Sequence, residues 1–244
     1  MEKEEVIVVK HLYKSFGDKH ILQGIDMVLH KGENLGIVGK SGTGKSVLIK
    51  CIVRLIEPDA GEINVLGTDV LACNDVELNE IRKKVGYLFQ GGALYDSMSV
   101  RDNLLFPLRR TQLVKNKQER EELIEGTLKS VGLLDAIDKM PAELSGGMKK
   151  RVALARTLIL RPEIILYDEP TTGLDAVTSG EISELILKIK EEYNTASIII
   201  THDMKCAKMA TDIIRIMKDG VFVVEGTYAE LSESTDKEIR DYFI

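Results

Sequence analysis

An eight-residue stretch combines glycines with a lysine and hydroxyl side chains at a spacing that suits phosphate binding. The apolar run 35–38 before it indicates a buried strand, and the apolar-rich stretch 47–56 after it indicates a helix. Its residues fit the pattern G-x-x-x-x-G-K-[ST] at every fixed position: Gly39, Lys40, Ser41, Gly42, Thr43, Gly44, Lys45 and Ser46. The glycines let backbone N–H groups converge on an anion, Lys45 can reach the β- and γ-phosphates, and Ser46 can ligate Mg²⁺. We therefore expect the chain to bind a nucleoside triphosphate.

Two adjacent carboxylates end a second apolar run. Residues 164–167 are typical of a central parallel strand buried on both faces, and Asp168 and Glu169 follow. Because ligands of such sheets bind beyond the carboxyl ends of the strands, we expect Asp168 near the Mg²⁺ and Glu169 nearer the γ-phosphate. There Glu169 would act as a general base or orient the attacking water. The alternative is that the two carboxylates cap a turn before Pro170.

Three further side chains stand where they would complete such a site, and each has an ordinary alternative. Gln90 follows an apolar strand and could ligate a metal or position a water, or it could be a polar loop residue. His202 ends another apolar strand and could hydrogen-bond a γ-phosphate oxygen, although a lone histidine is more often structural. Phe16 precedes a turn and could stack on a purine. It could also be an ordinary core phenylalanine, and Tyr13 competes for the same role.

Ser145, Gly146 and Gly147 form a second helix start with free amides and a hydroxyl, and therefore a second candidate anion site. The alternative is an ordinary capped helix whose first residues are flexible, which is the usual interpretation of such residues in other proteins. One chain rarely needs two such helix starts for one phosphate chain. Either each serves a different nucleotide, or two chains share one.

The apolar patterning predicts an α/β fold. From 99 to 160 the periodicity is helical with almost no strand, which indicates a helical subdomain inserted into the α/β core. Ser99 is expected to be the N-cap of its first helix. Residues 232–244 are expected to form one short polar helix. Strands are expected at 6–9, 21–29, 62–66, 85–88, 164–167, 197–201, 213–217 and 221–224, and helices at 47–56, 76–84, 149–160 and 177–193.

Composition limits the class of protein. The 244 residues are 44% hydrophobic, enough for one large domain or one domain with a subdomain. The net charge of −6, with both signs spread along the chain, gives no support to a nucleic-acid-binding surface. Three scattered cysteines suggest neither a zinc site nor disulfides and fit a reducing cytosol. The charged start does not resemble a signal peptide, and no apolar run approaches the roughly 20 residues that span a bilayer. If the protein acts at a membrane, we expect it to act from outside the lipid bilayer.

In their order along the chain, these motifs resemble those of the ATP-binding-cassette (ABC) ATPases, and the resemblance covers nearly the whole sequence. The matching segments are 39–46 with Walker A, Gln90 with the Q-loop, 144–147 with the signature motif, 164–169 with Walker B and its catalytic glutamate, 173–175 with the D-loop, His202 with the switch histidine, and Phe16 with the aromatic position beside the base.

This resemblance implies the fold of a P-loop NTPase, with a RecA-like core, an N-terminal antiparallel β subdomain and an inserted α-helical subdomain. Within a single domain, residues 1–90 and 161–230 would form the ATP-binding core, 91–160 the helical subdomain with the signature motif, and 231–244 a C-terminal helix. ATP and Mg²⁺ are the implied cofactors. The implied metal residues are Ser46, Gln90 and Asp168, and the implied catalytic residues are Glu169, His202 and Gln90.

The resemblance also implies partners. In a head-to-tail homodimer, Ser145, Gly146 and Gly147 of one chain would close on the ATP held by the phosphate-binding loop of the other, with Asp175 in the D-loop. The helical subdomain would grip a coupling helix of an integral-membrane permease, so that opening and closing of the dimer becomes mechanical work.

Variant residues refine the resemblance. Met148 stands where the family usually has Gln, Tyr167 stands where Walker B usually has Leu, and Ala176 stands where the D-loop often has Pro. With residues 91–108, the first two make the chain similar to the ATPases of Mla/Mce-type lipid transporters. That implies phospholipid transport between membranes, a peripheral location on the cytoplasmic face of the inner membrane, and Mce-domain and small accessory subunits as further partners.

Three other functions compete with the lipid hypothesis. An importer ATPase for a small solute, such as an amino acid, would share the chemistry. A soluble ABC protein of DNA repair or translation usually carries two cassettes or long insertions, which 244 residues do not accommodate. A non-hydrolysing regulatory cassette would lack the carboxylate that Glu169 supplies.

Overall fold

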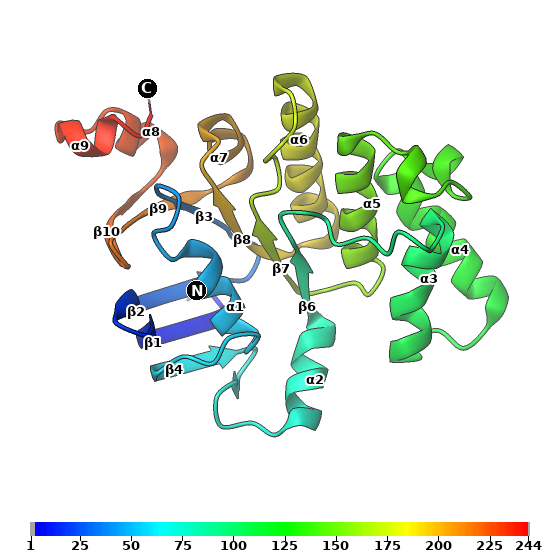
Figure 1. The fold of residues 1–244 in the computed structure, drawn as a ribbon, viewed down its shortest axis with the longest axis horizontal. Helices are drawn as coiled ribbons and strands as arrows, with labels where there is room; N and C mark the ends of the chain where they lie inside the picture. The colour runs from blue at the N-terminus through cyan, green and yellow to red at the C-terminus, as the bar shows by residue number, and fades with distance from the viewer. Residues whose placement is uncertain (1–2, 244) are drawn as a thin grey trace.

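Two β-sheets and a group of helices make up the computed structural model, which describes residues 3–243. Met1, Glu2 and Ile244 lie outside the described residues, and with them part of the charged start and the end of the predicted terminal helix. Figure 1 shows the antiparallel strands β1, β2 and β4 on one side of the larger sheet and the helices α3, α4 and α5 on the other.

The larger sheet carries the phosphate-binding loop. Its strand order is β10-β9-β3-β8-β7-β6, in which β9, β3, β8, β7 and β6 run parallel and β10 pairs antiparallel with β9. A parallel sheet collects loop residues at the carboxyl ends of its strands. Its strands are β3 (Asn34–Val38), β6 (Val85–Leu88), β7 (Ile164–Asp168), β8 (Ala196–Thr201), β9 (Ile213–Lys218) and β10 (Val221–Gly226).

The smaller sheet has the order β2-β1-β4-β5, with antiparallel pairing throughout. Its strands are β1 (Glu5–Phe16), β2 (Lys19–His30), β4 (Ala60–Val65) and β5 (Thr68–Asp69). β1 extends well beyond the expected run at 6–9, because the pairing with β2 continues past register shifts on either side of Leu12. The 17–18 turn between these strands leaves Phe16 at the end of β1.

Helices connect the strands and surround the larger sheet. They are α1 (Lys45–Ile52), α2 (Asp75–Lys84), α3 (Val100–Thr111), α4 (Lys117–Ser130), α5 (Gly146–Leu158), α6 (Ala176–Tyr193), α7 (Met204–Ala210), α8 (Tyr228–Ser232) and α9 (Lys237–Arg240), with 3₁₀ turns at Leu134–Ala136 and Pro141–Glu143. The Ser99 side chain accepts a hydrogen bond from the backbone N–H of Asp102, which confirms it as the N-cap of α3. Within residues 3–243, none of the helices has the length and apolar character needed to span a bilayer.

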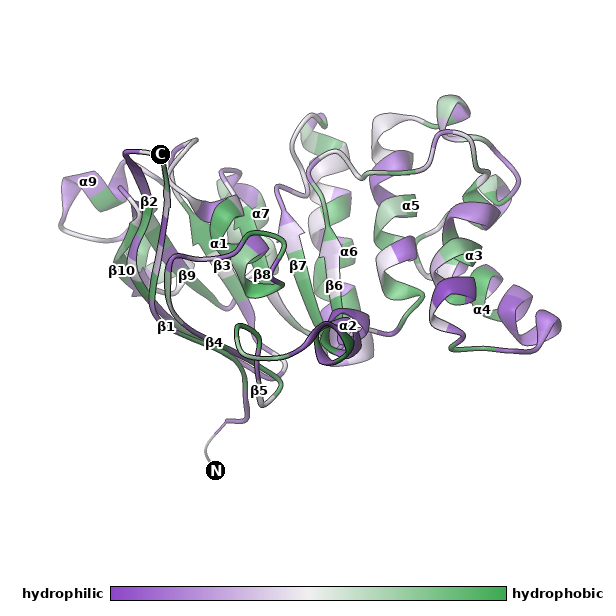
Figure 2. Cartoon of the chain, turned by 60° about the horizontal axis from the view of Figure 1, so that its bottom comes forward, coloured by the Kyte–Doolittle hydropathy of each residue, from purple (hydrophilic) through white to green (hydrophobic). Residues whose placement is uncertain are grey.

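Alternate residues of the central strands face two different cores. Ile164 and Leu166 of β7 pack with α1 and the smaller sheet, whereas Ile165 and Tyr167 pack with α5 and α6. This two-sided burial explains the unbroken apolar runs in the sequence. Figure 2 shows apolar residues concentrated on the central strands and hydrophilic residues on α2 and α4. The helices of 91–160 share this second core with the strands of the sheet, so within residues 3–243 no separate core marks a helical subdomain. The subdomain boundaries expected at 90/91 and 160/161 therefore stay a prediction.

The α/β fold class is confirmed, whereas the terminal helix expected over 232–244 is shorter than predicted and covers only α9, Lys237–Arg240. The chain forms α8 earlier, because Thr227 and Glu230 make a reciprocal capping box at its start. α8 then ends at Ser232, and α9 begins only after Asp236, whose side chain accepts a hydrogen bond from the N–H of Glu238. The N-cap at Asp236 therefore starts the terminal helix later than expected, and α8 precedes the expected range except for Ser232.

Candidate functional site

The loop between β3 and α1 has the backbone that a phosphate requires. Gly42 and Gly44 take positive φ values of 83° and 104°, which glycine adopts at no steric cost. A Cβ on Gly39 would come within 2.4 Å of the Met217 carbonyl oxygen, so the strand-to-loop exit also needs glycine. Gly44 is the N-cap of α1 and makes no side-chain cap hydrogen bond. The first amides of α1 are therefore available to an anion at the helix N-terminus.

Lys45 lies under this loop, with 6% of its surface exposed. Its ammonium Nζ donates to the carbonyl oxygen of Gly39 at 2.8 Å and to that of Lys40 at 2.9 Å. Burial lowers the pKa of Lys45, and the carboxylates of Glu169 and Asp168 oppose this effect. An ammonium group has three donors, so one remains for a phosphate oxygen.

Ser46 and Asp168 form a corner of hard oxygen ligands beside the loop. The Ser46 hydroxyl Oγ donates to Asp168 Oδ1 at 2.6 Å, so the predicted proximity of the two motifs is confirmed. The Tyr87 hydroxyl donates to the other carboxylate oxygen, Oδ2, at 3.2 Å. Burial raises the pKa of Tyr87, which keeps this hydroxyl protonated as a donor. Hydroxyl and carboxylate oxygens are the ligands that Mg²⁺ prefers.

Glu169 and His202 are brought together from the ends of two neighbouring strands, β7 and β8. Glu169 Oε2 lies 2.7 Å from His202 Nδ1 and accepts a hydrogen bond from the Thr172 hydroxyl at 3.1 Å. The Glu169 side chain is 12% exposed, whereas His202 is largely open to solvent. Glu169 has a φ of 53°, a left-handed conformation that costs a non-glycine residue on the order of 1 kcal/mol. Such a conformation at a carboxylate facing a cavity fits a catalytic group better than a simple turn cap.

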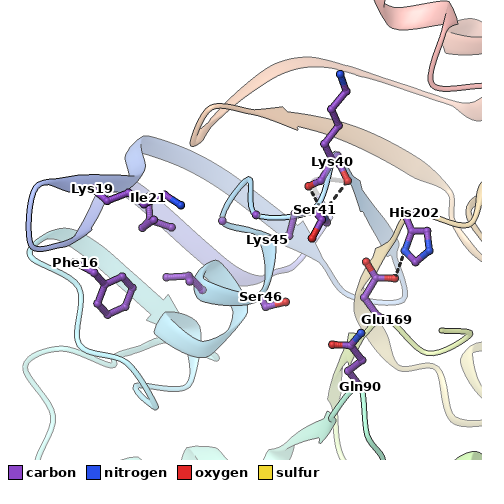
Figure 3. Close-up of a pocket in the computed structure, with 14 residues that line it drawn as sticks. Phe16, Lys19, Ile21, Lys40, Ser41, Lys45, Ser46, Gln90, Glu169 and His202 are labelled. Atoms are coloured by element: carbon purple, nitrogen blue, oxygen red, sulfur yellow. Dashed lines mark hydrogen bonds and ion pairs between the residues drawn. The ribbon is translucent and has the colours of Figure 1, made fainter. Parts of the chain in front are cut away.

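One cavity of about 680 Å³ gathers most of the predicted site residues. Figure 3 shows Phe16 at one end, Gln90, Glu169 and His202 at the other, and the phosphate-binding loop between them. This arrangement matches a nucleotide whose base lies at Phe16 and whose last phosphate lies at Glu169. The lining includes Phe16, Gly39, Lys40, Ser41, Gly42, Gly44, Lys45, Ser46, Gln90, Glu169 and His202. Thr43 and Asp168 do not line it: Thr43 donates to the Lys40 carbonyl, and Asp168 lies behind Ser46.

The second predicted anion site lies away from this cavity. Ser145 is exposed and caps α5, accepting a hydrogen bond from the Met148 N–H at 3.3 Å. Gly147 is buried, and a Cβ there would come within 2.4 Å of the Thr178 side chain. Asp175 caps α6 and accepts hydrogen bonds from the Thr178 hydroxyl and amide, which lower the pKa of Asp175. The chain's own cavity therefore contains no part of the signature motif or D-loop.

Two residues of the site were not predicted from the sequence. Tyr87 lies within the strand expected at 85–88 and Lys150 within the helix expected at 149–160, and neither was assigned a role in the site. Lys150 is 6% exposed, and its Nζ donates to the carbonyl oxygens of Gln90 and Glu169. The signal available for Lys150 was its place on the apolar face of the predicted helix 149–160, with Ala153 three positions later.

A glycine loop between the parallel strand β3 and the helix α1, with Lys45 and Ser46 behind it and Asp168 at the end of β7, which β8 separates from β3, defines the class of nucleotide-binding phosphohydrolases. Within that class the chain belongs to the ABC transporter family, whose family model, described as "ABC transporter", matches residues 22–172. The chain is therefore an ABC transporter ATPase with ATP and Mg²⁺ as cofactors, and these predictions are confirmed.

Several relatives match almost the whole chain. The intermembrane phospholipid transport system ATP-binding protein MlaF of Haemophilus influenzae is 39% identical, over 98% of this chain and 90% of the relative. Protein TRIGALACTOSYLDIACYLGLYCEROL 3 of Arabidopsis thaliana is 37% identical, over 99% of this chain and 74% of the relative. The methionine import ATP-binding protein MetN 1 of Bacillus licheniformis is 36% identical, over 97% of this chain and 71% of the relative.

A solved structure shares the fold. The ATP-binding cassette MJ0796, described as the dimeric structure of a post-hydrolysis state bound to ADP and Pi, has a TM-score of 0.83 and 31% identity, covering 91% of this chain and 98% of that chain. The residues described above fit the same cofactors. The third donor of Lys45 suits a phosphate oxygen, and Ser46 with Asp168 suits Mg²⁺, which neutralises phosphate charge when bound.

Replacing Tyr87 by Phe is expected to raise the Mg²⁺ concentration that gives half-maximal ATPase activity by roughly 2- to 10-fold, the effect of one hydrogen bond. The ring keeps its stack on Phe89, at 4.2 Å between centroids, but Asp168 Oδ2 loses its donor. The matched control is Tyr193→Phe, because Tyr193 is 41% exposed at the end of α6. A Tyr87→Phe titration that superimposes on the control would remove Tyr87 from the metal site.

Proposed function

We propose that this chain is the ATP-hydrolysing subunit of a lipid transporter, which powers phospholipid movement between membranes through a separate integral-membrane permease of the Mla/Mce type. It acts peripherally, on the cytoplasmic face of the inner membrane, and it binds no nucleic acid. The observation that carries this proposal is the similarity to MlaF, which extends over 98% of the chain and 90% of the relative. The similarity to TRIGALACTOSYLDIACYLGLYCEROL 3, whose name is that of a lipid, supports it.

The working form is a head-to-tail homodimer. The cavity that contains Lys45 and Glu169 is lined by no residue of the signature motif, and Ser145 is exposed at the start of α5. A second chain would bring its Ser145, Gly146 and Gly147 to the open side of the bound ATP. ATP then stabilises the closed dimer, and loss of the γ-phosphate removes those contacts.

The permease binds through a groove between β6, α3 and α5. We call it the α3 groove; it has a volume of about 530 Å³ and is lined by residues that include Phe89, Tyr95, Phe106, Pro107, Arg110 and Arg156. The Tyr95 and Phe106 rings lie 4.9 Å apart, and the Arg156 guanidinium lies over Tyr95 at 5.6 Å. Phe89 and Tyr95 remain 36% and 43% exposed. An apolar, aromatic groove with cations at its edge fits one helix of a membrane partner.

The competing function is an importer ATPase for a small solute. Its support is the similarity to MetN 1, at 36% identity over 97% of the chain. The two functions share the ATPase site and the α3 groove, so the identity of the partner separates them.

The test is purification of the tagged chain from its native membranes in mild detergent, followed by mass spectrometry of proteins and lipids. We expect a multi-span permease, an Mce-domain protein, small accessory subunits and phospholipid. A permease with a solute-binding protein instead would favour the importer, and the absence of any membrane partner would contradict both. In the same experiment Tyr95→Ala should release the permease, whereas Tyr193→Ala, an equally exposed tyrosine outside the α3 groove, should retain it.

A further inference from the structure

Lys150 is a buried cation directly behind the catalytic edge of the sheet. It lies on α5, is 6% exposed, and donates through Nζ to two backbone carbonyl oxygens, those of Gln90 and Glu169, the second at 3.3 Å. Burial lowers the pKa of Lys150, and the carboxylates of Asp168 and Glu169 oppose this. A buried ammonium is costly unless it is hydrogen-bonded, so this position needs a reason.

One of its two partners is the backbone of Glu169, which holds an uncommon conformation with a φ of 53°. The Glu169 N–H donates to the Ile200 carbonyl at 3.0 Å, and its own carbonyl accepts from Lys150. These two bonds fix the peptide groups on either side of the Glu169 Cα. The carboxylate therefore keeps the direction that places Oε2 2.7 Å from His202 Nδ1.

The other partner belongs to the loop that follows β6. The Lys150 ammonium donates to the Gln90 carbonyl oxygen at the start of this loop. Arg156, on the same helix, donates to the carbonyl oxygens of Gly92 at 3.0 Å and Ala93 at 2.8 Å. Two cations on α5 thus hold both ends of the 90–93 loop. The Gln90 backbone is therefore held by α5 directly after the end of β6.

We propose that Lys150 is a positioning residue for ATP hydrolysis, which holds the Gln90 and Glu169 backbones at a fixed separation so that the Gln90 amide and the Glu169 carboxylate face the same phosphate. Because one ammonium carries three donors on a single atom, it serves two carbonyls from different elements at once. The chemistry itself stays with Glu169. Lys150 also links the start of α5, which carries the signature motif, to the backbones of Gln90 and Glu169. A shift of either backbone would therefore be transmitted to the signature motif.

The test compares Lys150→Met with Lys149→Met in the full-length chain. Methionine keeps the length and apolar stem of lysine but has no donor, and Lys149 is the exposed neighbour on the same helix. For Lys150→Met we expect kcat for ATP hydrolysis to fall at least 10-fold while the ATP dissociation constant changes less than threefold, because the phosphate-binding loop is untouched. Lys149→Met should match the wild type in both. Hydrogen–deuterium exchange of the 90–93 amides should rise in Lys150→Met alone.

Lys150→Arg distinguishes positioning from packing, because it restores donors in a bulkier shape. We expect Lys150→Arg to recover kcat to within threefold to fivefold of the wild type. The proposal is overturned by a Lys150→Met enzyme that turns over like the Lys149→Met control. A second outcome also overturns it. In that outcome Lys150→Met loses kcat, ATP affinity and thermal stability together, and Lys150→Arg restores none of the three. If Lys150→Met does not fold, Lys150→Arg and Lys150→Gln test the proposal instead. We then expect a higher kcat for the arginine variant, which has more N–H donors than the glutamine variant, and the reverse order would contradict the proposal.

Discussion

Glu169→Gln is expected to lower kcat for ATP hydrolysis by about 100- to 10,000-fold, the range that a general base contributes. The amide has nearly the shape of the carboxylate and still accepts the hydrogen bond from Thr172. It cannot take a proton from the attacking water. Among residues 3–243, the Glu169 carboxylate hydrogen-bonds to Thr172 and His202 and to no residue of the phosphate-binding loop, so ATP should remain bound. Steady-state turnover and the ATP dissociation constant, measured on the same preparation, test both halves of this expectation.

Glu163→Gln is the matched control for this substitution. Glu163 precedes the other end of the same strand, β7, is 51% exposed, and pairs on the surface with Lys84 at 3.1 Å. Removing its charge should leave turnover unchanged, because exposed ion pairs contribute little. Wild-type turnover in Glu169→Gln would remove Glu169 from its role as the base.

The same variant also tests the proposed homodimer. With ATP bound but not hydrolysed, Glu169→Gln should accumulate as a dimer, and light scattering during gel filtration should report twice the mass of the chain without ATP. A variant that binds ATP, turns over slowly and stays a monomer would contradict the shared site and leave the role of Glu169 intact.

The residues that could be predicted from the sequence are those at the ends of apolar strands. The run before Asp168 and Glu169 indicated a strand buried on both faces, and β7 is completely buried. Because parallel strands end at one edge, the positions of Asp168, Glu169 and His202 followed from the strands alone. The glycine loop was predictable for a related reason, since Gly42 and Gly44 have the positive φ that other residues avoid.

Residues that act through contacts between elements could not be predicted in the same way. Tyr87 reaches Asp168 across neighbouring strands, and the sequence does not reveal that β6 is the neighbour of β7. Lys150 lies within Lys149-Lys150-Arg151, where a charge run normally indicates a solvated face. The extent of the terminal helix was predicted incorrectly for a local reason: the N-cap at Asp236 starts α9 later than 232, and the capping box at Thr227 forms the separate helix α8 before it.

Lys45→Ala is expected to weaken ATP binding by roughly 10- to 100-fold, because it removes a charge-assisted hydrogen bond worth about 1.5–3 kcal/mol. Lys45 is the cation beneath the phosphate-binding loop, and two of its donors already hold the Gly39 and Lys40 carbonyls. Its loss therefore removes the phosphate contact and loosens the loop together. Direct titration with a fluorescent ATP analogue, with no hydrolysis required, measures the effect.

Two further variants separate the charge of Lys45 from its packing. Lys45→Met keeps the length of the side chain, so it should weaken ATP binding as much as alanine does if the ammonium is what matters. Lys50→Ala removes a lysine from the last turn of the same helix, α1, and should leave ATP affinity unchanged. Wild-type affinity in Lys45→Ala would contradict the phosphate role. Equal losses in Lys45→Ala and Lys50→Ala would instead place the effect in the stability of α1, because Lys45 lines the cavity and Lys50 does not.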